Sequence, residues 1–232
     1  MKHQSNILAL KYRPLNFQDL IGQEYLVETI QKSIQQNKIP NAYIFTGIRG
    51  VGKTTTARIV AKMLNCTVFD KNNNPDLINC EQAKAITEDR HPDVIEIDAA
   101  SNTSVENARE IIENVKYNPV LGKYKVYIVD EVHMLSKSAF NALLKTLEEP
   151  PPHSKFIFAT TEISKVPITI LSRCQRFDLR RVEKKTLSDF LKSIAKKEDI
   201  TISNEALNLI VKASDGSVRD SLSILDQANV FK

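Results

Sequence analysis

The chain has 232 residues, 42% of them hydrophobic and 26% charged, which is enough apolar content to bury a core in one large and one small folding unit. Its formal net charge of +4 is compatible with a polyanionic partner, but an excess this mild does not identify one. The N-terminus has no apolar signal region, no apolar run approaches membrane-spanning length, and three cysteines cannot form an even disulfide framework. These features exclude secreted disulfide-rich and membrane-spanning classes and favour a reduced, cytoplasmic protein.

The first predicted elements are a buried strand at residues 42–45, a glycine-rich loop and a helix at residues 55–64. The loop matches the pattern G-x-x-x-x-G-K-[ST] at every fixed position. Glycines let backbone N–H groups turn toward a phosphate, and the helix N-terminus presents its positive dipole end to the same anion. A chance glycine-rich turn is the alternative, which the flanking strand and helix disfavour. The expected nucleotide-binding residues are Gly47, Ile48, Arg49, Gly50, Val51, Gly52, Lys53, Thr54 and Thr55.

Two acidic residues, Asp130 and Glu131, follow the apolar strand at residues 126–129. Their presence distinguishes nucleotide hydrolysis from phosphate transfer by a kinase. Asp130 is placed to hold Mg²⁺ together with the Thr54 hydroxyl, and Lys53 can reach the β- and γ-phosphates. Glu131 can orient and deprotonate a water, which a kinase would not need. A GTPase would need a guanine-reading Asn-Lys-x-Asp segment, which the sequence lacks. A solvated acidic pair closing a strand remains the alternative, and ATP hydrolysis is the leading chemistry.

The remaining elements predict the architecture. Further strands are expected at residues 94–97 and 156–159, with a weaker one at 177–179, and helices at 105–115 and 138–147. Because the strands are nearly continuously apolar, they predict an α/β fold with a parallel sheet and helices on both faces. From about residue 180 the pattern is helical only. A capping box at Thr186 to Asp189 starts the first of three helices, which form a small lid.

The motifs together resemble the γ/τ family of bacterial DNA polymerase III subunits, the motor subunits of the sliding-clamp loader. The resemblance runs from about residue 8 to the end, and its Ser-Arg-Cys segment is characteristic of clamp loaders. The motifs that carry it, in chain order, are Tyr12-Arg-Pro14, Asp19-Leu-Ile-Gly-Gln23, Gly47 to Thr54, Asp98-Ala-Ala-Ser101, Asp130-Glu-Val-His133, Leu143 to Pro150, Ala159-Thr-Thr161, Ser172-Arg-Cys174 and Gly216-Ser-Val-Arg-Asp220.

The resemblance implies an AAA+ fold, with a P-loop ATPase domain at residues 1–179 and a helical lid at 180–232. Members normally continue into a collar domain that this chain lacks, so the chain is expected to be part of a longer protein. The implied cofactors are ATP and Mg²⁺. The implied partners are other loader subunits, the sliding clamp and primer-template DNA, and a longer form would also bind the polymerase core and a helicase.

The resemblance also assigns roles to single residues. Thr161 corresponds to the first sensor of the γ-phosphate, Arg219 to the second sensor in the lid, and Arg173 to the arginine finger that reaches a neighbouring subunit. A permanently charged guanidinium suits that last role. Tyr12, Arg13 and Pro14 correspond to the segment near adenine. Surface salt bridges for the arginines, a backbone-bonded hydroxyl for Thr161 and an ordinary anchored loop at residues 12–14 remain the alternatives.

One departure concerns zinc. Members of the family usually carry a small zinc module with four cysteines in the order C-x8-C-x2-C-x2-C. Here, within a degenerate insertion at residues 66–91, Cys66 and Cys80 match only the outer two places. Structural zinc needs four good ligands, and even His91 would add only a third, so no bound zinc is expected.

Contact with DNA is left unassigned to single residues. The region after Asp98-Ala-Ala-Ser101 lines the DNA in the family, but here Asn102-Thr-Ser104 is neutral, and a capped helix start explains it equally well. Two alternative functions stay open. One is another AAA+ DNA motor such as a branch-migration helicase, and the other is a non-hydrolysing structural subunit of the loader.

Overall fold

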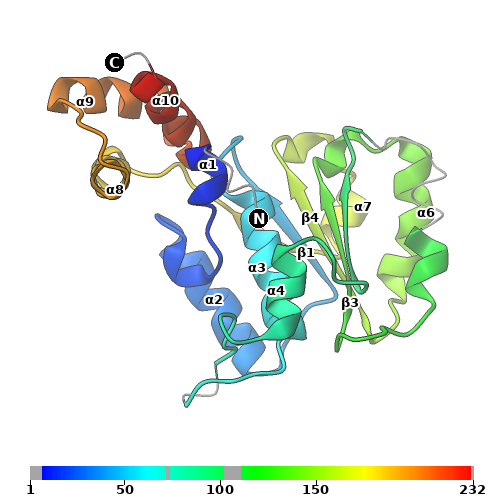
Figure 1. Cartoon of the computed structure of the whole chain (residues 1–232). Helices are drawn as coiled ribbons and strands as arrows, with labels where there is room; N and C mark the ends of the chain where they lie inside the picture. The colour runs from blue at the N-terminus through cyan, green and yellow to red at the C-terminus, as the bar shows by residue number, and fades with distance from the viewer. Residues whose placement is uncertain (1–6, 72–73, 102–110, 231–232) are drawn as a thin grey trace.

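The computed structural model describes residues 7–71, 74–101 and 111–230. A five-stranded sheet forms the centre of its larger part, with all pairs of neighbouring strands parallel (Figure 1). Across the sheet the order is β2-β3-β4-β1-β5. The strands are β1 (Ala42–Thr46), β2 (Val94–Asp98), β3 (Lys125–Asp130), β4 (Ser154–Thr160) and β5 (Gln175–Asp178). The predicted parallel α/β sheet is confirmed, including the weak fifth strand.

Burial of each strand follows its place in the sheet. The central strands β3, β4 and β1 are buried along almost their whole length, which explains their continuous apolar sequence. The edge strands β2 and β5 have exposed positions, so their apolar signal is weaker. All strands run in one direction, so Thr46, Asp98, Asp130 and Thr160 end at the same edge of the sheet.

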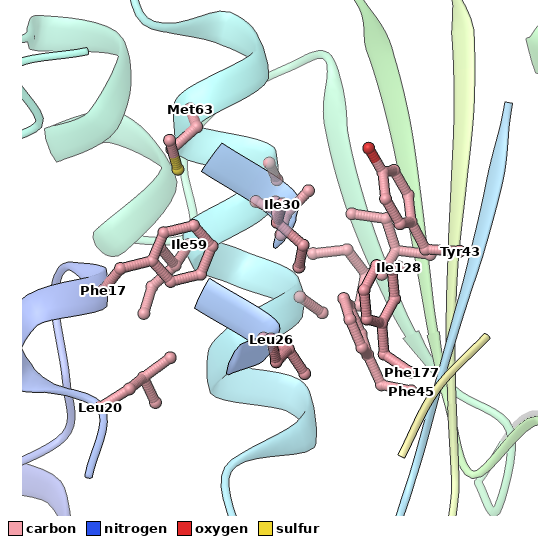
Figure 2. Close-up of a cluster of buried hydrophobic side chains, with 14 of the residues drawn as sticks. Phe17, Leu20, Leu26, Ile30, Tyr43, Phe45, Ile59, Met63, Ile128 and Phe177 are labelled. Carbon is pink, nitrogen blue, oxygen red and sulfur yellow. The ribbon is translucent and has the colours of Figure 1, made fainter. Parts of the chain in front are cut away.

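Helices cover both faces of the sheet (Figure 1). On one face, α2 (Glu24–Gln35) and α3 (Lys53–Asn65) pack their apolar sides on the strands. On the other face lie α6 (Lys137–Glu148), α7 (Ile168–Leu171) and the helical residues 111–115. Of the helix predicted at 105–115, residues 105–110 lie outside the described ranges. The first of these cores, shown in Figure 2, includes Phe17, Leu20, Leu26, Ile30, Tyr43, Phe45, Ile59, Met63, Ile128 and Phe177.

A third core lies outside the sheet. It is formed by α8 (Lys184–Lys197), α9 (Asn204–Ala213) and α10 (Val218–Val230), which are the three predicted lid helices. The short helix α1 (Leu8–Lys11) joins this core through Leu8 and lies beside α10 (Figure 1). The predicted capping box is wrong: α8 begins at Lys184 after Glu183, so Thr186 already lies inside its first turn. The division at residue 179 stays a prediction.

Short elements complete the described chain. They include the 3-10 helices η1 (Phe17–Asp19), η2 (Val132–Met134) and η3 (Ile163–Lys165). The α-helix α4 (Glu81–Thr87) packs near α3. None of the helices in the described ranges is both long and apolar enough to cross a membrane.

Candidate nucleotide site

The phosphate-loop motif lies between β1 and α3, as the pattern predicted. Gly47, Gly50 and Gly52 have φ angles of 147°, 78° and 104°, which side-chain-bearing residues rarely adopt. At Gly50 a Cβ would also lie only 2.1 Å from the Ser217 hydroxyl oxygen, because the turn before α10 packs directly on this loop. The loop therefore presents its backbone with no side chain at the points of closest approach.

Lys53 and Thr54 begin α3 directly beneath the loop. The Lys53 side chain is buried, and its Nζ donates to the carbonyls of Gly47 and Ile48 at 3.0 Å each. Burial lowers the pKa of Lys53, and the nearby carboxylates of Glu131 and Asp130 oppose that shift. The Thr54 hydroxyl donates to Oδ2 of Asp130, which brings the end of β3 against the start of α3.

The second acid is held by the neighbouring strand. The backbone N–H and hydroxyl of Thr161 donate to Oε2 of Glu131 at 3.1 and 2.9 Å. Thr161 directly follows β4, which pairs with β3, so both residues leave the sheet at the same edge. The structure therefore brings together the four residues Lys53, Thr54, Asp130 and Glu131 with the predicted sensor Thr161.

A cavity of about 900 Å³ opens above these residues. Its floor is the phosphate loop and the acid pair, and its walls come from the N-terminal segment and the lid. The wall residues include Tyr12, Arg13 and Pro14 of the predicted adenine segment, together with Phe190, Val218, Arg219 and Leu222 of the lid. The predicted second sensor Arg219 thus faces the same cavity, and its backbone N–H donates to the Gly50 carbonyl at 3.2 Å.

Two contacts fix the N-terminal segment across this cavity. The Tyr12 hydroxyl donates to Glu198 at the end of α8, and this bond raises the Tyr12 pKa to about 12. Arg13 Nε donates to the Thr55 hydroxyl at 3.2 Å. Burial and repulsion from Arg58 lower the pKa of Arg13. The segment therefore joins the lid to the first turn of α3.

Arg173 lies apart from the residues that line this cavity. It follows α7 and its guanidinium pairs with Glu148 at the end of α6 and donates to the Thr169 carbonyl. Such a position suits a residue that acts on a neighbouring copy, but it equally fits the surface salt bridge that the sequence left open.

Sequence reasoning missed several residues of the site. Asp98 ends β2 in register with Asp130 and lines the cavity, and Glu198 anchors Tyr12 from far along the chain. His133 follows the acid pair in the sequence motif but received no role; its ring lies beside Glu131. Asp98 and His133 were both signalled, through their places in the Asp98 to Ser101 and Asp130 to His133 motifs, whereas no motif signalled Glu198.

The donor set fits a magnesium-bound nucleoside triphosphate. A hydroxyl and a carboxylate, from Thr54 and Asp130, are the hard oxygen ligands that Mg²⁺ prefers. Phosphate oxygens can be bound by the backbone N–H groups at the three glycines with positive φ, by the N-terminus of the 13-residue helix α3 and by the buried Lys53.

The degenerate insertion has a different environment. Cys66 and Cys80 are buried against Val68, Leu77 and Ala83. The nitrogens of His91 are engaged by Gln82 and by the backbone N–H of Asp93. Among the described residues, which omit 72 and 73, no group of three or more His, Cys, Asp or Glu side chains is arranged to hold a metal. The expectation that no zinc binds stays a prediction, and Asn102 to Ser104 lie outside the described residues.

Comparison with known proteins gives a consistent family. A family model described as DNA polymerase III, delta subunit, matches residues 22–183, and one described as DNA polymerase III clamp loader subunit, ATPase lid domain, matches residues 186–231. The DNA polymerase III subunit tau/gamma of Haemophilus influenzae is 50% identical over 96% of this chain and 32% of that protein. The tau subunit of Bacillus subtilis is 49% identical over 95% of this chain and 39% of its own length. The chain thus spans about a third of the length of these relatives.

Among solved structures, the RuvB Holliday junction branch migration motor of Thermotoga maritima is similar with a TM-score of 0.66. The match covers 92% of this chain and 64% of RuvB at 19% identity. At this identity the likeness shows the AAA+ fold alone.

Proposed function

The chain belongs to the DNA polymerase III clamp-loader subunit family, and we propose that it forms the ATP-hydrolysing motor part of a γ/τ-type subunit. One observation carries the enzymatic part of the proposal. Lys53, Thr54, Asp130, Glu131 and Thr161 converge at one edge of the sheet beneath one cavity. A spacer subunit would not need this arrangement, because each of these groups serves phosphate chemistry.

The residues divide the reaction between them. Lys53 and the loop N–H groups bind the β- and γ-phosphates, and Thr54 and Asp130 hold Mg²⁺. Mg²⁺ supplies positive charge that stabilises negative charge on the phosphate oxygens. Glu131 orients the attacking water and accepts its proton, while Thr161 senses the γ-phosphate.

The remaining roles concern assembly. Arg219 draws the lid onto the ATP-bound loop, which its backbone already contacts. Arg173 completes the site of a neighbouring subunit, so that ATP binding orders the interfaces and holds the sliding clamp open. Primer-template DNA then triggers ATP hydrolysis, which releases the clamp. The protein acts in the bacterial cytoplasm. A longer product would add contacts to the polymerase core and a helicase.

A glutamine variant tests the enzymatic step. Glu131→Gln keeps the shape of the side chain but removes the proton acceptor, so we expect ATP turnover to fall about 100-fold or more. Binding of a fluorescent ATP analogue to the chain should stay unchanged. Glu28→Gln, on the exposed face of α2, is the matched control and should keep full turnover. Equal turnover by wild type and Glu131→Gln would contradict the assignment.

Turnover in the assembled loader tests the wider function. We expect the full-length protein, mixed with partner subunits, to hydrolyse ATP faster only when both the clamp and primed DNA are present. Stimulation by DNA without the clamp would point to a translocating motor. Tight ATP binding without turnover would point to a structural subunit.

A further inference from the structure

The Glu131 carboxylate has a second neighbour besides Thr161. Nδ1 of His133 lies 3.4 Å from the same oxygen, Oε2, that accepts both Thr161 bonds. The His133 side chain is only 6% exposed, so its ring is fixed by packing rather than free in solvent. A buried imidazole beside the proposed general base needs an explanation that the ATP-binding residues do not supply.

The other contacts of His133 lead away from the nucleotide. Nδ1 lies 2.9 Å from the Thr160 hydroxyl, and Nε2 lies 3.4 Å from Oε1 of Glu162. The Thr160 hydroxyl oxygen also accepts the Glu162 backbone N–H at 3.0 Å, and Glu162 pairs with Lys165 at 2.8 Å. The ring therefore sits between two carboxylates, one in the site and one at the start of η3.

We propose that His133 is a positioning residue, which couples the Glu131 carboxylate to Glu162 and so to the segment that ends at Arg173. This inference rests on the proposed roles of Glu131 and Arg173. A neutral imidazole has one donor and one acceptor. When Nδ1 carries the proton, it donates to the Thr160 hydroxyl and its N–H lies near Oε2 of Glu131; when Nε2 carries it, Nδ1 accepts from Thr160 and the Nε2 N–H lies near Oε1 of Glu162, each carboxylate oxygen being 3.4 Å from its ring nitrogen. The two carboxylates thus compete for one ring.

The polypeptide chain directly links the residues around His133 to Arg173. From Thr160 the chain passes through Thr161 and Glu162 into η3, then α7, and reaches Arg173. Ile170 of α7 is fully buried in the core of that face, so α7 is held by packing rather than free as a loose loop. Engagement of Arg173 by a neighbouring subunit shifts Glu162 relative to His133, and the ring transmits this shift to Glu131.

Steady-state kinetics of the assembled full-length protein tests the coupling. His133→Leu keeps much of the volume but no hydrogen bond, and we expect kcat to fall about tenfold, less than for Glu131→Gln, with KM for ATP unchanged. His133→Asn places an amide near the Nδ1 position and should restore most of kcat. Glu162→Gln should lower kcat with His133 present and have no further effect in the His133→Leu background.

The controls separate this inference from the proposed function. His153→Leu removes a similar ring at the opposite end of β4, where it bonds to the Val115 carbonyl, and should keep kcat. If His133→Leu does not fold, the same cycle is run with His133→Met, which also lacks the ring nitrogens, and Glu162→Gln. Wild-type kcat in His133→Leu, or losses from His133→Leu and Glu162→Gln that multiply, would overturn the inference while Glu131→Gln still lowered turnover about 100-fold. An inactive wild-type assembly would overturn the proposed function and this inference together.

Discussion

At the scale of single residues, Glu131 stands out by its backbone. Its φ of 46° and ψ of 45° lie in the left-handed region, which costs a non-glycine residue about 1 kcal/mol or more. Its N–H donates to Oδ1 of Asp130 at 2.9 Å, and its carboxylate accepts two bonds from Thr161. These bonds hold the strained conformation, which turns the chain from β3 into η2. Strain that the surroundings maintain is typical of functional positions.

Lys62 is a second unusual residue, buried on α3 with its Nζ 3.3 Å from the Leu15 carbonyl. Burial and repulsion from Arg58 and Arg13 lower its pKa from 10.5 to about 8. Below pH 8 the residue is charged in both the folded and unfolded states, and its burial then destabilises the fold. Between pH 8 and 10.5 the unfolded chain binds a proton that the folded chain does not, so stability rises with pH.

We therefore expect Lys62→Met to raise the free energy of unfolding by about 1–3 kcal/mol at pH 7. The advantage should shrink between pH 8 and 10.5, since the wild-type amine becomes neutral there while the variant lacks the bond to Leu15. Urea unfolding at a series of pH values measures it. Lys196→Met, at an exposed position of α8, should change stability by less than about 0.5 kcal/mol. A gain that does not vary with pH would contradict the assigned cause.

The sequence revealed those residues of the site that lie next to one another in the chain. Gly47 to Thr54 and the acid pair were predicted because their spacing alone defines a geometry. The contact of Tyr12 with Glu198 was not predicted, because it joins positions 186 residues apart. Distances of that kind depend on how α1 and α8 pack, which no local pattern encodes.

At the scale of elements, the helices differ in how they begin. Ser136 caps α6 by accepting the Ala139 N–H at 3.2 Å, and Ser203 caps α9 by accepting the Ala206 N–H at 3.1 Å. By contrast, Glu183 precedes α8 without a side-chain cap bond. The predicted capping box failed because the Thr186 to Asp189 pattern is also compatible with the interior of an amphipathic helix, and here Leu187 and Leu191 pack in the lid core from within α8.

Removal of the α6 cap should weaken the sheet domain. We expect Ser136→Ala to lower the free energy of unfolding by about 1 kcal/mol, because the Ala139 N–H loses its acceptor. Ser193→Ala, at an exposed position inside α8, is the matched control and should be neutral or slightly stabilising. Thermal and urea unfolding followed by circular dichroism compare the two. Equal stability of both variants would show that water replaces the cap without cost.

The sheet was predicted more fully than the helices around it. Continuous apolar runs at β1, β3 and β4 specify buried parallel strands, and the structure places these three side by side at the centre. The strand order itself was not predicted, since it depends on crossovers rather than on composition. The packing of α1 with the lid was also missed, because four residues carry too short a pattern to show which core they join.

At the scale of the whole molecule, two chain segments connect the lid to the phosphate loop. The N-terminal segment contributes Leu8 to the lid core and Arg13 to the first turn of α3. The turn before α10 contacts Gly50 through the Arg219 N–H. Both connections border the cavity, so a nucleotide bound there would contact two segments that are joined to the lid. This arrangement suits a subunit whose lid position reports the state of its nucleotide.

Contacts between subunits can be tested at Arg173. The proposed function has Arg173 act on a neighbour, and its guanidinium lies apart from its own cavity, where it pairs with Glu148 of the same chain. Arg173→Ala should lower turnover of the assembled loader about 1,000-fold, while the chain still binds ATP. Arg176→Ala, three residues further on and paired with Asp178, is the matched control and should retain turnover.

Mixing two inactive variants distinguishes action on a neighbour from action within one subunit. A loader with several copies of this subunit, some Arg173→Ala and some Glu131→Gln, should regain part of its ATP turnover. In such an assembly the Glu131→Gln copy supplies its arginine to an adjacent copy whose own Lys53, Asp130 and Glu131 are intact. Recovery should rise and then fall as the mixing ratio changes, since it needs both kinds of neighbour at one interface. If no ratio restores turnover, Arg173 acts within its own subunit or only through the Glu148 pair that it forms here.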